Sequence, residues 1–163
     1  MIHSLNAMRV LGIDPGYDRC GVAVMQKNTA HGELLFSSCV VTDRSQDFSL
    51  RLRTIGSALE EILTTYEPDI VAIEHLYFNT NQKTAVHVAE IRGVVLYLAS
   101  RRDCRILEYT PQEVKVAVTG YGKSDKKQVT AMVTRLLPTT KKGALDDEYD
   151  AIAIALTALA SAR

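Results

Sequence analysis

The chain has 163 residues, of which 47% are hydrophobic and 23% are charged, and its formal net charge is zero. These values are ordinary for one globular domain that buries a substantial core. No run of 18 uncharged apolar residues occurs, and residues 1–8 lack the basic and apolar regions of a secretion signal. We therefore expect a flexible extension at residues 1–7, one domain over residues 8–163, and a cytoplasmic protein.

The first part of the chain predicts strands. Three strand-like segments are joined by short links, which favours an antiparallel meander. They are Val10–Asp14, Gly21–Met25 and Leu34–Val41. The first of them is an apolar run that stops at Asp14, before a Pro-Gly turn signal.

The remaining segments alternate between helix and strand. Apolar residues spaced by three and four predict an amphipathic helix over Phe48–Tyr66, and the apolar run Ile70–Ile73 predicts a strand that is covered on both faces and ends at Glu74. Further helices are expected at Thr84–Ser100, from Pro111, from Ser124 or Asp125 to Leu137, and at Asp146–Ala160, with a strand at Arg105–Tyr109. The result is an α/β protein whose mixed five-stranded sheet, with three antiparallel strands followed by parallel strands, has helices on both faces. This order resembles that of the ribonuclease H-like fold.

Four carboxylates stand at positions where they could meet. Asp14 and Glu74 each end a strongly apolar strand, and binding sites in open α/β sheets lie at that edge. Asp147 and Asp150 are three residues apart and share one face of the last predicted helix. Four carboxylates in one place would raise one another's pKa values, and hard divalent cations such as Mg²⁺ or Mn²⁺ relieve that repulsion. Two such ions about 3.5–4 Å apart can support phosphodiester hydrolysis.

Each carboxylate also has an ordinary explanation when it is taken alone. Asp14 could cap the turn that follows it, Glu74 could be a solvated strand end, and the helical pair could interact with the helix macrodipole. Asp146 is the expected N-cap, and it stands beside Asp147 as an alternative ligand. It is the occurrence of all four, each next to an apolar element, that favours a metal-dependent nuclease.

Two further compositional features bear on function. Residues 101–142 hold ten basic and four acidic residues, a net charge of +6, so the rest of the chain carries −6. A basic block beside an acidic pocket suits a protein that grips a polyanion, although a solvated surface would look the same. Cys20, Cys39 and Cys104 are widely spaced and form no C-x-x-C, so neither a zinc site nor a disulfide framework is expected.

Four segments, in this order, resemble the RuvC family of Holliday-junction resolvases. They are Leu11–Gly16, Ile73–Asn79, the DNA-binding segment Glu108–Lys115 with Gly120–Val129, and the D-x-x-D-A helix start Asp147–Ala151. The resemblance covers roughly residues 8–161. It implies paired, symmetric cuts in four-way junction DNA during recombination and repair, made by a homodimer with two Mg²⁺ ions per active site, for which Mn²⁺ can substitute. It also implies a branch-migration helicase complex as a possible partner.

The same resemblance assigns roles to individual residues. It makes Asp14, Glu74, Asp147 and Asp150 the catalytic metal ligands. It places Tyr77 where an aromatic stacks on a base near the branch point, with Phe78 as the neighbouring alternative, and such stacking contributes about 1–3 kcal/mol per base. It also makes Lys115 and Lys126 phosphate contacts, with Lys123 and Lys127 as further contacts. Thr84–Ser100 is the candidate dimer helix, or an ordinary core helix.

Other functions remain open at this point. The pattern D-x-G-x-x-R-x-G-V-A, which begins at Asp14, is similar to that of RuvC-like nucleases that mature ribosomal RNA precursors. A non-catalytic module that binds branched DNA would lack one of the carboxylates. A sugar-kinase-like ATPase would need a second glycine-rich phosphate loop and a longer chain.

Overall fold

The computed structural model describes residues 7–28, 32–75, 82–140 and 143–162. The predicted N-terminal extension, except for its last residue, lies outside this part of the chain, as do Tyr77 and Phe78. Within the described residues no helix is both long enough and apolar enough to cross a membrane.

In the part of the chain that the structure describes, the sheet has five strands in the order β3-β2-β1-β4-β5. In chain order the strands are β1 (Arg9–Asp14), β2 (Arg19–Gln26), β3 (Glu33–Val41), β4 (Ile70–Glu74) and β5 (Arg105–Tyr109). The first three pair antiparallel, whereas β4 is parallel to both β1 and β5. This confirms the predicted mixed sheet and places β1 at its centre, where it is covered on both faces.

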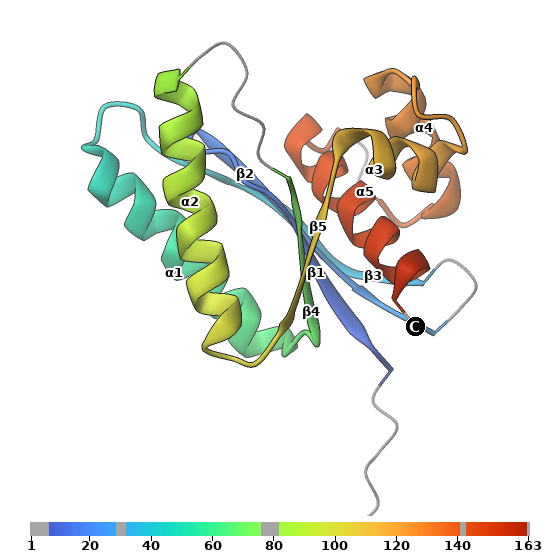
Figure 1. Cartoon of the computed structure of the whole chain (residues 1–163), viewed down its shortest axis with the longest axis horizontal. Helices are drawn as coiled ribbons and strands as arrows, with labels where there is room; N and C mark the ends of the chain where they lie inside the picture. The colour runs from blue at the N-terminus through green and yellow to red at the C-terminus, as the bar shows by residue number, and fades with distance from the viewer. Residues whose placement is uncertain (1–6, 29–31, 76–81, 141–142, 163) are drawn as a thin grey trace, which may run out of the picture.

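The described residues form five helices, and Figure 1 shows how these cover the two faces of the sheet. One face carries α1 (Phe48–Tyr66) and α2 (Gln82–Ser100), and the other carries α3 (Pro111–Thr119), α4 (Lys126–Leu136) and α5 (Asp146–Ser161). Capping boxes begin two of these helices: Thr110 pairs with Glu113 at α3, and Asp125 pairs with Gln128 at α4. Of the two caps considered for α4, Asp125 is the one that the structure uses.

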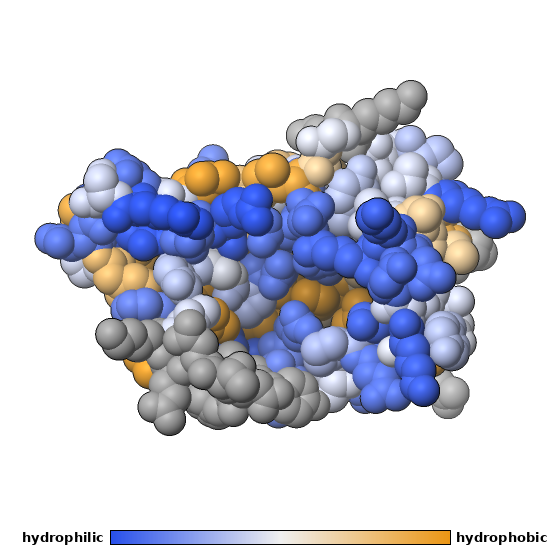
Figure 2. Space-filling view, turned by 90° about the horizontal axis from the view of Figure 1, so that it is seen from above, coloured by the Kyte–Doolittle hydropathy of each residue, from blue (hydrophilic) through white to orange (hydrophobic). Residues whose placement is uncertain are grey.

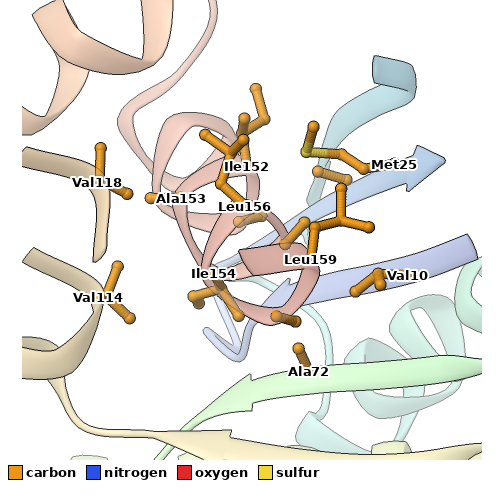
Figure 3. Packing of buried hydrophobic residues seen from close by; sticks show 14 of the residues in the cluster. Val10, Met25, Ala72, Val114, Val118, Ile152, Ala153, Ile154, Leu156 and Leu159 are labelled. Carbon is orange, nitrogen blue, oxygen red and sulfur yellow. The ribbon is translucent and has the colours of Figure 1, made fainter. Parts of the chain in front are cut away.

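Helix α5 forms the centre of the second layer. Its residues from Ala151 to Leu159 are all buried, which confirms the prediction from its continuous apolar sequence. Figure 3 shows side chains of α5, among them Ile154 and Leu159, between the sheet and the valines of α3. Replacing these side chains by smaller ones would lower the free energy of unfolding, both because apolar burial is lost and because a cavity is left.

Two glycines allow α5 to lie directly on the sheet. A methyl group on Gly12 would fall 2.7 Å from the main-chain nitrogen of Ala155, and one on Gly21 would overlap the main-chain carbonyl of Asp147. Glycine inside a strand weakens it, and is found where another backbone approaches closely. These positions therefore fix the height of α5 above β1 and β2, and with it the position of the carboxylates that α5 carries.

Candidate active site

The strands bring Asp14 and Glu74 together. Ile13 and Ile73 are register partners in the parallel pair β1–β4, so the next residue of each strand emerges at the same edge of the sheet. Both strands are almost completely buried up to that point, and both carboxylates are half-buried. The predicted meeting of two strand-end carboxylates is therefore a consequence of strand direction and register.

Helix α5 adds the other two carboxylates from above the sheet. Asp147 and Asp150 lie in its first turns, over β2 and β1, where Gly21 and Gly12 permit close contact. The predicted N-cap was wrong: Leu145 has the extended backbone of an N-cap, so Asp146 is already inside the helix. The side chain of Asp146 is 68% exposed and that of Asp147 is 19% exposed, so Asp147 is the one enclosed in the site.

Burial and mutual repulsion change the protonation of this cluster. Burial raises the pKa of Asp14, and the negative charges of its neighbours raise it further, to about 7. In decreasing order of effect these neighbours are Asp150, Glu74 and Asp147. Burial likewise raises the pKa of Glu74 and of Asp150. The charges of Glu74, Asp147 and Asp150 therefore all act on Asp14, and perturbation of this kind is found at functional sites.

Lys126 partly neutralises the cluster. Its Nζ lies 2.9 Å from Asp150 Oδ2 and 3.7 Å from Asp146 Oδ2. Burial acts to lower the pKa of Lys126, but the hydrogen bond and charge of Asp150 outweigh burial and leave it raised. The ammonium group in turn offsets part of the rise in the pKa values of Asp14, Glu74 and Asp150, which remain raised overall.

A pocket of about 270 Å³ opens beside these groups. Its polar lining comes from Glu74, Asp150, Lys115 and Lys126, and its apolar lining comes from α3, α4 and α5. Figure 2 looks onto this edge of the molecule, where hydrophilic residues surround a hollow in which apolar residues are visible. Carboxylates and lysines at one pocket can serve a cation and a polyanion at the same time.

Asp147 has an oxygen that accepts no hydrogen bond from any described part of the chain. Its Oδ2 is buried, and Arg19 Nε, which forms an ion pair with it at 3.0 Å, is not oriented to donate a hydrogen bond to it. A misdirected N–H compensates little of the desolvation of a carboxylate, even at this short distance. The sequence did not predict a role for Arg19 at this site. Its place in the pattern D-x-G-x-x-R-x-G-V-A was the one signal that could have indicated it.

The donor set fits hard divalent cations. Every candidate ligand is a carboxylate oxygen, the type that Mg²⁺ and Mn²⁺ prefer, and a buried oxygen of Asp147 accepts no hydrogen bond from the described residues. As they are placed, no three His, Cys, Asp or Glu side chains of the described chain are close enough together to hold one ion. Carboxylates that repel one another and contact a lysine are expected to spread in this way, and side-chain rotations would be needed to close a coordination shell.

The structure divides the predicted DNA-binding residues into three groups. Lys115 and Lys126 line the pocket beside the carboxylates. Lys123 and Lys127 are exposed, near the start of α4. Tyr77 and Phe78 fall outside the described residues, in the segment that follows Glu74.

The basic block of residues 101–142 does not form one surface. Arg105 begins β5 and pairs with the first residue of β4, so it lies at the opposite edge of the sheet from Glu74. Arg102 lies at that edge too, beside Asp69 and Asp103. Among the described basic residues of this block, Lys115 and Lys126 line the pocket beside the carboxylates, so the charge summed along the sequence overstated the size of the basic surface there.

Fold and site together define a class: a ribonuclease H-like α/β domain with an acidic cluster at the carboxyl ends of its strands. The family model described as "Crossover junction endodeoxyribonuclease RuvC" matches residues 10–158. The chain belongs to this family.

Individual relatives agree with this assignment. The chain is 41% identical over 150 residues to the crossover junction endodeoxyribonuclease RuvC of Caldanaerobacter subterraneus subsp. tengcongensis, an alignment that covers 91% of this chain and 90% of that protein. Its structure is similar to that of Thermus thermophilus RuvC in complex with a Holliday junction substrate, with a TM-score of 0.85, 32% identity and 92% of each chain covered. The yeast mitochondrial Holliday junction resolvase, at 15% identity and a TM-score of 0.66 over 94% of this chain and 79% of that one, shares the fold.

Proposed function

We propose that the chain is a structure-specific endonuclease that resolves Holliday junctions by paired, symmetric, Mg²⁺-dependent hydrolysis of phosphodiester bonds. The observation that carries this proposal is the convergence of Asp14, Glu74, Asp147 and Asp150 at one edge of the sheet, beside a pocket that also holds Lys115 and Lys126. Membership of the family and the junction-bound relative support the choice of substrate.

The four carboxylates would hold two Mg²⁺ ions, and Mn²⁺ would substitute for Mg²⁺. When bound, these ions supply a water of lowered pKa and stabilise the leaving oxygen. Asp14 and Glu74 approach from the sheet, and Asp147 and Asp150 approach from α5, so the protein can surround the ions from two layers. Lys115 and Lys126 then face the phosphate, while Lys123 and Lys127 hold the backbone further along the strand.

Two symmetric cuts require two copies of the site, and α2 is the proposed contact between them. Val86 is 53% exposed and Tyr97 is 60% exposed, and with Gly93 they lie on one face of α2. Gly93 is exposed, and a methyl group there would meet nothing within 4 Å. A glycine in an exposed helix costs about 1 kcal/mol relative to alanine, which is understandable if a second copy packs closely against it. Sedimentation of a Tyr97→Lys variant as a monomer would support this face, and an unchanged dimer would exclude it.

The test of the proposed activity is a cleavage assay on a synthetic four-way junction, a duplex and a structured RNA, with Mg²⁺, Mn²⁺ or no metal. We expect two symmetric nicks in the junction only. Asp14→Asn should abolish cleavage and keep junction binding, whereas Asp47→Asn, an exposed aspartate at the start of α1, should behave as wild type. An intact junction together with trimmed ribosomal RNA precursor would favour the RNA-maturing alternative, and binding without cleavage in either metal would favour a non-catalytic module.

Binding should also depend on salt and on partners. Lysine contacts to phosphates release counterions, so affinity for the junction should fall steeply as salt rises, and a flat response would remove the lysines from the interface. Association with a branch-migration helicase and a cytoplasmic location remain part of the proposal, since both follow from the family.

A further inference from the structure

Arg92 is a buried arginine on α2. Arg92 is only 8% exposed, and a guanidinium group that is removed from water needs hydrogen-bond acceptors for its N–H groups. Its Nη1 donates to the main-chain carbonyl of Glu74, and its Nη2 donates to Glu108 Oε2 at 3.0 Å. One side chain of α2 therefore reaches the ends of two neighbouring strands.

Glu108, on β5, completes the arrangement. His75 Nδ1 lies 3.0 Å from the same Oε2 that accepts from Arg92. The main-chain nitrogen of His75 donates to the carbonyl of Tyr109 at 2.7 Å, which continues the β4–β5 pairing by one residue. These contacts hold both ends of the Glu74–His75 peptide group: α2 binds its carbonyl through Arg92, and β5 accepts from its N–H.

The end of β4 is where such support matters. Glu74 is the last residue of its strand, and its register partner Tyr109 is the last residue of β5. The direction of the Glu74 side chain therefore depends on how the following peptide is held. A displacement of about 1 Å at a reacting group can cost about 100-fold in rate.

We propose that Arg92, with Glu108, is a positioning residue that sets the orientation of the Glu74 carboxylate by fixing the Glu74 main-chain carbonyl. Neither side chain contacts metal or DNA in this role. The inference rests on the proposed function of Glu74 as a metal ligand.

The test compares Arg92→Lys with a matched control on the same helix. Lysine keeps the charge but lacks the planar fork, so it cannot hold the Glu74 carbonyl and Glu108 together. We expect Arg92→Lys to weaken Mn²⁺ binding by about 10- to 100-fold in calorimetry and to lower kcat similarly, with KM for the junction changed less than about twofold. Val95→Ala removes a buried apolar side chain from α2 without touching Glu74, so it should lower stability and leave Mn²⁺ affinity unchanged.

A second measurement needs neither metal nor activity. Amide hydrogen exchange at His75 in the metal-free protein should be faster in Arg92→Lys than in wild type and in Val95→Ala, after correction for global stability. Glu108→Gln should give a smaller effect of the same kind, and the double variant should bind Mn²⁺ no more weakly than Arg92→Lys alone.

The outcomes separate the inference from the function on which it rests. Wild-type Mn²⁺ affinity and exchange in Arg92→Lys would overturn the inference, as would an equal loss of affinity in Val95→Ala. A wild-type protein that neither binds Mn²⁺ nor nicks a junction would overturn the proposed function instead. In that case the exchange rate at His75 would still decide whether Arg92 holds the backbone at Glu74.

Discussion

Replacing Asp14 by asparagine should stabilise the metal-free protein. The pKa of Asp14 rises from its ordinary value of 3.8 to about 7 in the folded chain, first because it is buried and then because of its carboxylate neighbours. Between these two values the folded state holds a proton that the unfolded chain has released, so stability falls as pH rises through this range. Above pH 7 the decrease in the free energy of unfolding is complete. Asp14→Asn avoids this decrease because asparagine carries no charge.

The size of the effect follows from the two pKa values. Each pKa unit corresponds to about 1.4 kcal/mol, so the raised pKa of Asp14 lowers the free energy of unfolding by about 4 kcal/mol at pH 8, but by only about 2 kcal/mol at pH 5, where the folded carboxyl is still protonated. For a chain of this length, 4 kcal/mol corresponds to a change in Tm of roughly 10 °C.

The assay is thermal unfolding of wild type, Asp14→Asn and Asp47→Asn in chelator at pH 5 and pH 8. We expect Asp14→Asn to have the highest Tm at pH 8, a reduced advantage at pH 5, and Asp47→Asn to follow wild type. Saturating Mg²⁺ should raise the Tm of wild type and not that of Asp14→Asn, because binding to the folded state alone is stabilising. A Tm for Asp14→Asn at or below wild type at pH 8, or a gain that is independent of pH, would refute this account of the cluster.

Three further substitutions test other parts of the site and its support. Gly21→Ala would place a methyl group against the Asp147 carbonyl, so α5 must move; we expect cleavage to fall at least tenfold, and wild-type kinetics would show that this close approach is dispensable. Lys126→Met removes the cation beside Asp150, so Mn²⁺ should bind more tightly in calorimetry while junction cleavage slows, and weaker Mn²⁺ binding would contradict a lysine that competes with metal. Ile152→Ala empties a fully buried position on α5 and should lower the free energy of urea unfolding by about 3 kcal/mol, whereas a loss below about 1 kcal/mol would mean that the core closes around the gap.

The strand ends were predictable because the apolar runs themselves mark them. Val10–Ile13 and Ile70–Ile73 are buried on both faces, so an acidic residue that follows each run has only the strand edge to occupy. The pair on α5 was predictable from helical spacing. What the sequence could not show was that parallel pairing puts Ile13 opposite Ile73, since register between strands sixty residues apart depends on the whole sheet.

The supporting residues were harder to find. Arg92 stands within an apolar helix, and its partners Glu74 and Glu108 are distant along the chain, so only the fold brings them together. The one signal in the sequence for a role of Arg92 was that a charged residue occupies a position of α2 where the helical pattern predicts burial. The expected N-cap at Asp146 was wrong because helix limits depend on backbone angles one residue earlier, and a local sequence pattern does not determine them.

The late position of α5 in the sequence also determines when the carboxylate cluster can form. Half of the carboxylate set resides on this helix, and the other half lies in β1 and β4, so a ribosome-bound chain of about 140 residues would carry Asp14 and Glu74 without their partners. The same chain would leave the face of β1 and β2 beside Gly12 and Gly21 uncovered. Completion of the core and assembly of the carboxylate cluster therefore both wait for α5, and a chain that lacks this helix would not form the proposed metal site.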